Sequence, residues 1–329
     1  DILPVLVCGL SVPLSLFMWL GNVTFSKFLF TKSEYLEDSV IPPTRWLFST
    51  VFPVCLAVYA IVKKSLTKSA ALLGLALTVI ISIASHAFFV CEVVFFFTSS
   101  RATNFRANIK RKVEHDFKEG GQRNWAQVLC NSGMAAQLAV FYLLDCGSGE
   151  RAINFEHQYR PSWLGIGVLS AFACCNGDTW ASELGTVLSR ADPFLITTRK
   201  RVPRGTNGGV SIVGLVLSFL GGLVIGFAYF ITIINTVHAS ELVVSPPQWP
   251  LILVGGAAGL FGSLIDSFLG ATLQYSGMTK DGKIVESPDR DVKYISGLRI
   301  LDNNSVNLIS SVLVAVTMPY FANKIWPSI

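Results

Sequence analysis

Long apolar stretches divide this chain and restrict what it can fold into. A helix needs about 20 apolar residues to cross the hydrocarbon core of a bilayer. The chain holds about eight such stretches, at residues 3–23, 46–62, 69–98, 124–144, 162–188, 209–237, 248–276 and 303–323. Only 14% of its residues are charged, whereas a soluble domain has about 25%. We therefore predict an all-α fold: a polytopic integral membrane bundle of about eight transmembrane helices, in one domain over residues 1–329.

The third stretch, residues 69–98, is longer than a single crossing requires. The sequence leaves open whether it tilts, breaks near Ser85 and His86, or includes a turn at the membrane surface. Within the bundle we distinguish N-terminal helices (1–98), a basic cytoplasmic connection (99–123) and a catalytic helical core (124–329). Two small-xxx-small spacings in the core, Gly222 to Gly226 and Gly255 to Gly259, predict close helix packing.

Lysine and arginine residues are sorted between the two ends of the predicted helices. With eight spans, the odd-numbered connections carry 20 of the 26 basic residues, and the even-numbered connections with the C-terminus carry the other 6. Connections rich in Lys and Arg face the cytoplasm, so we predict that the odd connections are cytoplasmic and both termini lie on the other side. The net charge of +5 then reflects topology and not a nucleic-acid partner. We expect an endoplasmic reticulum or other endomembrane location.

The fifth apolar stretch contains a polar segment, Phe172-Ala-Cys-Cys-Asn-Gly-Asp-Thr-Trp-Ala-Ser-Glu-Leu-Gly185. A carboxylate at the bilayer centre costs roughly 2.5–3.5 kcal/mol, and this segment holds two, Asp178 and Glu183. A helix that faced only lipid would not tolerate both, so we predict a functional site that faces the bundle interior or a wet cavity. Polar residues also serve as contacts between helices, which would account for Thr179 and Ser182 but not for the acids.

Further polar groups lie at the same predicted cytoplasmic side. Residues from separate helices would rarely gather on one side by chance, so we infer that they form one site with the acidic segment. They are Arg123, Asn124, Gln127 and Asn131 at the start of the fourth helix, Gly259, Ser263, Asp266, Gly270 and Gln274 on one face of the seventh, and Asp302, Asn303 and Asn307 at the start of the eighth.

The connection after the fifth stretch has the outline of a phosphate-binding loop. Its glycines, Gly205, Gly208 and Gly209, leave the backbone free to adopt positive φ and to approach a ligand. The next helix starts near Ser211, where exposed N–H groups and the helix dipole favour an anion. The loop is not a Walker A motif, because it lacks GxxxxGK followed by Ser or Thr. Cations able to grip phosphate are Arg199, Lys200, Arg201 and Arg204.

The carboxylates predict metal-assisted chemistry. Mg²⁺ takes oxygen ligands together with substrate phosphates, and phosphoryl transfer combines such a metal with cationic clamps. We predict that Asp178, Glu183 and Asp266 are catalytic. The predicted metal ligands are Asp178, Glu183, Asp266 and Asp302. Substrate or phosphate binding is predicted for the loop cations and glycines, Ser211 and the polar group that starts the fourth helix, and also for Asn176, Thr179, Ser182, Thr206, Ser263, Gln274 and Asn303. Glu92 lies apart from these clusters and is predicted to be structural.

Three motifs, NGDTWASELG, RVPRGTNGGVS and GSLIDSFLGATLQ, resemble the signatures of the transmembrane protein 19 family, and the similarity covers nearly the whole chain. That family includes the phytyl-phosphate kinase of tocopherol biosynthesis and is distantly similar to polyprenol and dolichol kinases. The resemblance implies phosphoryl transfer from a nucleoside triphosphate, such as CTP or ATP with Mg²⁺, to a prenyl or phytyl monophosphate. It also implies, as motif positions, most of the polar residues above together with Pro203 and Gly270.

Two other functions stay open at this point. A nucleotidyltransferase or pyrophosphatase acting on a lipid phosphate would use the same metal site. A transporter of an anionic solute would show inverted repeats and polar groups near the midplane, but the sequence shows no repeat and its polar groups gather on one side. The expected partners are an isoprenoid lipid phosphate, a nucleoside triphosphate and membrane lipids, and a homodimer is left open.

Overall fold

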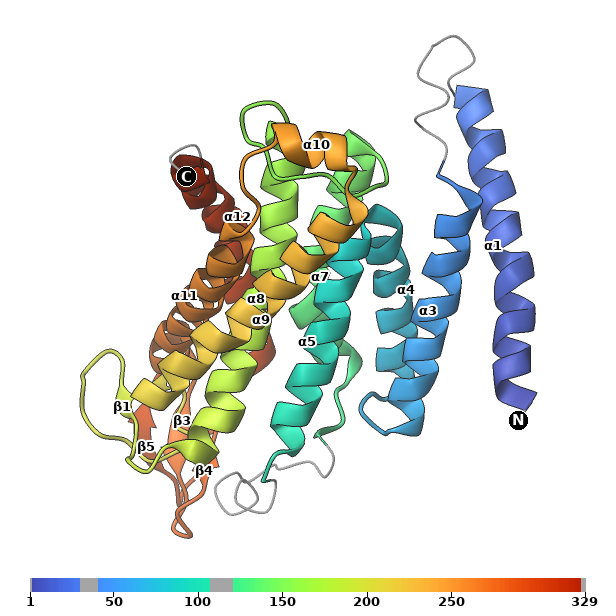
Figure 1. The fold of residues 1–329 in the computed structure, drawn as a ribbon. Coiled ribbons are helices and arrows are strands. Elements are labelled where there is room, and N and C mark those ends of the chain that lie inside the picture. The colour runs from blue at the N-terminus through green and yellow to red at the C-terminus, as the bar shows by residue number, and fades with distance from the viewer. Residues whose placement is uncertain (1, 30–40, 107–120, 327–329) are drawn as a thin grey trace.

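The computed structural model describes residues 2–29, 41–106 and 121–326 of the chain. Helices dominate the described residues, and the predicted all-α membrane bundle is confirmed as a class (Figure 1). By length and apolar composition, five of the described helices suffice to cross a membrane: α3, α7, α9, α11 and α12. The helices are α1 (Ile2–Leu29), α3 (Pro43–Val62), α4 (Lys68–Ala84), α5 (His86–Asn104), α7 (Trp125–Cys146), α8 (Tyr159–Leu188), α9 (Ile212–Thr236), α10 (Ala239–Val244), α11 (Pro250–Leu273) and α12 (Asn303–Ile325). Part of the predicted basic connection, residues 107–120, lies outside the described residues.

Helix α8 is the centre of the bundle. It packs against α5, α7, α9, α11 and α12, and its residues 164–177 are all buried. A helix that is apolar around its whole circumference belongs inside a bundle, which explains this position. Helices α1 and α3 lie at one edge of the bundle, where α3 packs mainly against α1 and α4 (Figure 1). The acidic segment therefore lies on the most enclosed helix, and not on one that faces only lipid.

The long third stretch breaks at a single residue. Ser85 is extended (φ −158°, ψ 138°) between α4 and α5. Its backbone N–H donates to the Ile81 carbonyl (3.1 Å) and ends α4, while its hydroxyl accepts from the Ala87 N–H (3.1 Å) and starts α5. The two helices run in opposite directions from this point (Figure 1). A break near Ser85 was one of the three predicted alternatives for this stretch.

The break changes the predicted topology. Helix α1 starts and α12 ends at opposite ends of the bundle (Figure 1), contrary to the prediction that both termini share one side. The connection between α3 and α4 now lies at the same end of the bundle as the start of α7. Most Lys and Arg residues in the described part of the chain lie at this end. We call it the basic end and the opposite one the less basic end; the basic end holds the C-terminal ends of α8 and α11.

Helices α9 and α11 pack backbone against backbone. A Cβ on Gly255 would lie 2.6 Å from the carbonyl oxygen of Gly222, and a Cβ on Gly226 would lie 2.5 Å from the carbonyl oxygen of Leu251. Neither position has room for a side chain, so the predicted close approach at the two small-xxx-small spacings is confirmed.

Two small sheets complete the basic end (Figure 1). In the first, β1 (Phe194–Leu195) pairs antiparallel with β2 (Gly209–Val210), which closes the glycine-rich loop. In the second, β3 (Ser276–Met278) pairs antiparallel with β4 (Ile284–Val285) and with β5 (Lys293–Ser296). Strands of two to four residues are too short to leave a period-two pattern, which is why the sequence did not predict them.

A buried ion pair joins three segments at the less basic end. Glu150, between α7 and α8, accepts from Arg45 Nη2 of α3 (2.7 Å) and from the backbone N–H of His86 at the start of α5 (2.6 Å). The side chains of Arg45 and Glu150 are only 9% and 8% exposed. Burial alone would raise the pKa of Glu150, but the hydrogen bond and charge of Arg45, with contributions from His86, lower it. The carboxylate form of Glu150 thus stabilises the fold.

We expect Glu150→Gln to destabilise the protein at pH 7 by about 3–5 kcal/mol, because the Arg45 charge would remain buried without its partner. The folded-state pKa of Glu150 is depressed below its unfolded value of about 4.3. Its contribution is therefore complete above that value and is lost as pH falls through the folded pKa. Thermal unfolding of wild type and variant should differ strongly at pH 7 and converge in acid.

Asp145→Asn is the matched control for this experiment. Asp145 pairs at 2.8 Å with Arg160, whose side chain is 76% exposed, and exposed pairs contribute about 0–1 kcal/mol. Equal losses of stability in the two variants at pH 7 would contradict the role assigned to Glu150.

Candidate functional site

Two carboxylates from different helices form the centre of the candidate site. Asp178 of α8 and Asp266 of α11 lie close enough for their charges to act on each other. The Ser263 side chain hydrogen-bonds Asp178, and Ser310 Oγ of α12 donates to Asp266 Oδ2 (3.4 Å). We call Asp178 and Asp266 the acid pair. Like charges at short range repel, so this arrangement is suited to a bound cation or a shared proton.

Small residues bring the acid pair together. A Cβ on Gly177 would lie 2.7 Å from Gly259 Cα, and a Cβ on Gly262 would collide with Cys174. Helices α8 and α11 therefore touch through their backbones immediately beside the acids. Asp178 follows Gly177 directly and Asp266 lies one turn after Gly262, so this contact brings the two acids near each other.

Helix α12 adds an amide group to the acid pair, and an amide of α7 lies next to it. With its amide turned to satisfy its neighbours, the Asn307 nitrogen donates to Asp266 Oδ2 (3.0 Å) and to the Asn303 carbonyl (3.2 Å). Asn307 also lies 3.4 Å from the Asn131 side chain. Ser310 was not predicted, although Asn303, Asn307 and Ser310 follow at four- and three-residue steps along one face of α12 and so carried a signal.

Arg123 and Glu183 form the charged edge of the site. The Arg123 guanidinium lies over the Phe95 ring, 5.7 Å from its centroid. Burial lowers the pKa of Arg123 and the Glu183 carboxylate opposes that shift, but a guanidinium remains charged in either case. The predicted site thus contains a fixed cation at the basic end of α7, near its predicted acid Glu183.

Asn124 and Gln127, predicted to bind substrate, form a capping box at the start of α7. Asn124 Oδ1 accepts from the Gln127 N–H (3.0 Å), and Gln127 Oε1 accepts from the Asn124 N–H (2.9 Å). This reciprocal pairing satisfies the first amides of the helix. The sequence carried the signal, since a capping residue followed three positions later by Gln precedes an apolar run.

Other predicted binding residues of α8 make contacts within the protein. Asn176 is fully buried, accepts from Thr98 Oγ1 (2.8 Å) and Ser99 Oγ (3.1 Å), and donates to the Gly221 carbonyl (2.8 Å). It therefore joins α5, α8 and α9. The hydroxyls of Thr179 and Ser182 donate to carbonyls of α8 itself.

The glycine-rich loop packs against the end of α11. Gly205 and Gly208 adopt positive φ (85° and 78°), as predicted, and a Cβ on Gly208 would lie 2.6 Å from the Ser267 carbonyl oxygen. Ser211 accepts from the Gly214 N–H (3.0 Å) and caps α9. The Thr206 hydroxyl donates within the loop, to the Pro203 carbonyl. The conformation of the loop is thus explained by packing.

The four loop cations divide into two kinds. Arg201 donates to the Asp192 carbonyl, and Arg204 donates to the Arg190 carbonyl (3.0 Å) and lies 3.6 Å from Asp192 Oδ1. Arg199 and Lys200 are exposed at the basic end. They are the loop cations with the most freedom to meet an anionic ligand.

The predicted metal set is only partly assembled. Within residues 2–29, 41–106 and 121–326, no group of three or more His, Cys, Asp or Glu side chains lies close enough to hold a metal ion. Asp302 caps α12 by accepting from the Ser305 N–H (2.8 Å), and hydrogen bonds from the Ser305 side chain and backbone lower its pKa. Gln274 donates to Glu286 Oε1 (2.8 Å). The acid pair is therefore the part of the predicted set that the fold brings together.

Comparison with known proteins places the chain in a family. The model of the family described as integral membrane protein DUF92 matches residues 51–315. The chain belongs to this family. The resemblance predicted from the three motifs is thereby confirmed, and so is its character as a multi-pass integral membrane protein.

The chain is similar to proteins of a plant, a cyanobacterium and an archaeon. The chain is 42% identical over 276 residues to Protein PGR of Arabidopsis thaliana, covering 83% of this chain and 95% of that protein. It is 31% identical over 153 residues to an uncharacterized membrane protein of Methanocaldococcus jannaschii, covering 46% and 49%. It is 25% identical over 241 residues to Protein VTE6, chloroplastic, of Arabidopsis thaliana, covering 72% and 60%. No solved structure matches.

Thermal stability should separate the acid pair from the structural amide beside it. We expect Asp178→Asn to unfold at a higher temperature than wild type, because it removes repulsion between buried carboxylates. Asn176→Ala should lose about 1–3 kcal/mol, because the partners of the amide would be buried without hydrogen bonds. Unfolding of both variants in detergent would be followed by fluorescence. A loss in Asp178→Asn as large as that in Asn176→Ala would show that Asp178 is structural.

Proposed function

We propose that this protein is an isoprenoid-phosphate kinase, which transfers a phosphoryl group from a nucleoside triphosphate such as CTP or ATP to a prenyl or phytyl monophosphate. The observation that carries the proposal is the acid pair, Asp178 and Asp266, enclosed by polar groups from four helices at the basic end of a membrane bundle. The motif resemblance supplies the reaction class. The positive-inside rule supports a cytoplasmic site, and an endomembrane location stays a prediction.

The reaction has simple bond changes. An oxygen of the lipid monophosphate attacks the γ-phosphorus of the nucleotide and forms a new P–O bond. The P–O bond to the β-phosphate breaks, and the nucleoside diphosphate leaves with the electron pair. A phosphate oxygen is already a nucleophile at neutral pH, so the protein need only position both substrates and stabilise charge.

The residues at the site fit a magnesium ion. Mg²⁺ is usually held by one or two carboxylates together with substrate phosphates, and the acid pair offers two carboxylates from separate helices. Asp178 and Asp266 would hold the ion, which when bound neutralises charge on the transferred phosphoryl group. Ser263 and Ser310 fix the orientation of the carboxylates through their hydrogen bonds.

Arg123 and the loop cations would hold the phosphates. Arg123 is fixed by its contact with Phe95 and can grip one phosphate through two N–H groups. Arg199 and Lys200 are exposed at the same end of the bundle and are suited to the nucleotide. Glu183 lies near Arg123 and would orient it, rather than act as a separate metal ligand.

Product analysis tests this function. Purified protein in nanodiscs would receive Mg²⁺, each nucleoside triphosphate in turn, and phytyl or geranylgeranyl monophosphate. We expect mass spectrometry to find the lipid diphosphate together with the matching nucleoside diphosphate. Asp178→Asn and Asp266→Asn should lose this turnover by about a hundredfold or more, as losses of electrostatic stabilisation do.

Asp302→Asn is the control, because Asn caps a helix about as well as Asp and the structure uses Asp302 as a cap. It should retain turnover within a few-fold of wild type. Pyrophosphate release with a nucleotidyl-lipid product would contradict the kinase and favour a nucleotidyltransferase. Full activity of either acid-pair variant would remove that residue from the site.

A further inference from the structure

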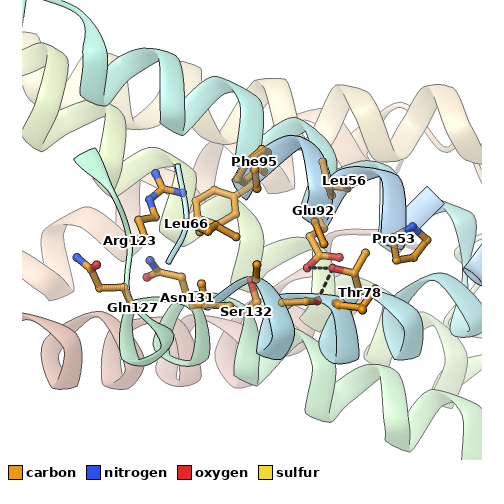
Figure 2. A pocket seen from close by; sticks show the side chains of 17 residues that line it. Pro53, Leu56, Leu66, Thr78, Glu92, Phe95, Arg123, Gln127, Asn131 and Ser132 are labelled. Atoms are coloured by element: carbon orange, nitrogen blue, oxygen red, sulfur yellow. Dashed lines mark hydrogen bonds between the residues drawn. The ribbon is translucent and has the colours of Figure 1, made fainter. Parts of the chain in front are cut away.

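An apolar cavity leads from the candidate site into the membrane region of the bundle. It lies between α3, α4, α5 and α7, and most of the side chains that line it are apolar. Figure 2 shows Arg123, Gln127 and Asn131 at one end. Small residues such as Ala57, Ala71 and Gly74 contribute to its walls. A cationic mouth and apolar walls suit a ligand with an anionic head and a hydrocarbon tail.

The end of the cavity that holds Arg123 and Asn131, its mouth, lies near the acid pair. Asn131 lines the mouth, and its backbone carbonyl accepts from Cys175 Sγ (3.4 Å) on α8, three residues before Asp178. Arg123 lines the same end and lies near Glu183. A phosphate held at this mouth would therefore be next to the residues assigned to phosphoryl transfer.

A buried carboxyl group lies at the inner part of the cavity. Glu92 is 6% exposed, and its Oε1 accepts from Thr78 Oγ1 (3.1 Å) (Figure 2). Its other oxygen, Oε2, has no hydrogen-bond partner in the described part of the chain. Thr78 stands ten residues along α4 from Lys68 at the basic end, which is about 15 Å of helix. The predicted structural role of Glu92 leaves Oε2 unexplained.

We propose that this cavity holds the prenyl tail of the lipid phosphate and that Glu92 sets the longest tail that fits; the identity of this lipid rests on the proposed function. A buried carboxyl oxygen needs a polar partner such as water. A tail that ends short of Glu92 leaves room for that partner. A tail that reaches Glu92 removes it, and so longer tails bind less well.

Substitutions at two positions test this limit in opposite directions. Turnover would be measured with geranyl, farnesyl and geranylgeranyl monophosphates as kcat/KM. Glu92→Leu replaces the carboxyl by an apolar group of similar size, and should raise the ratio for geranylgeranyl over farnesyl by roughly tenfold. Glu92→Gln, the matched control, keeps a polar group and should leave the ratio near that of wild type.

Gly74→Leu should have the opposite effect. A Cβ at Gly74 would meet Val128 and Leu66 at ordinary distances of 3.8 and 3.9 Å, so the backbone accepts a side chain, and the rest of the leucine would occupy the cavity. The ratio for geranylgeranyl over farnesyl should fall. Unchanged ratios in both Glu92→Leu and Gly74→Leu would overturn the proposal.

Photo-crosslinking separates this proposal from the kinase activity. Farnesyl monophosphate with a diazirine at the tail end would be bound without nucleotide, irradiated, and the labelled peptides identified. Label on α4 and α5 around Thr78 and Glu92, weaker in Gly74→Leu, is the expected result. If the same residues are labelled but the protein shows no turnover, the proposed tail site is supported and the proposed kinase activity is contradicted. Turnover with label elsewhere would overturn the tail site and leave the kinase standing.

Discussion

Charge in a low-dielectric interior is the constraint on which this structure depends. The free energy of exposing two carboxylates to lipid is too high for them to lie on the outside of the bundle. Asp178 instead lies on α8, the most enclosed helix, near Asp266 of α11. Glycines next to the acids let the two backbones touch, and serine and asparagine side chains from α11 and α12 hydrogen-bond the carboxylates. Two carboxylates held together repel each other unless a cation or a shared proton lies between them, and sites of that kind trade stability for function.

The same close packing leaves space where it is useful. Small residues pull α8, α9 and α11 together, so the acids and the start of α9 gather at the basic end. Small residues also lie between α3, α4, α5 and α7, but there the helices do not pack closely. The space left between them is the cavity that reaches Glu92. A charged mouth near the acid pair and an apolar cavity behind it are the arrangement on which the proposed binding of an amphipathic phosphate rests.

Much of this could be predicted from the sequence, for local physical reasons. The apolar stretches, the acidic segment and the positive φ of Gly205 and Gly208 each depend on residues that are adjacent in the sequence. The break at Ser85 could be named only as one alternative, because a single capping hydroxyl decides it. The Arg45–Glu150 pair and the buried hydrogen bonds of Asn176 join residues far apart in sequence, so no local pattern predicts them. The unpaired oxygen of Glu92 depends in the same way on how the helices pack. Substrate binding by Asn124 stays a prediction, and its capping bonds with Gln127 add a structural role.

Binding of nucleotide as a function of Mg²⁺ tests the central claim most directly, since it needs neither turnover nor a known lipid. Titration calorimetry on the purified protein would compare wild type with Asp178→Asn, Asp266→Asn and the double variant. If the acid pair acts as one unit, Mg²⁺ tightens nucleotide binding to wild type, either single substitution removes that effect, and the double substitution removes no more. Tightening by Mg²⁺ that persists in the double variant would contradict the account, because the ion would then be held elsewhere.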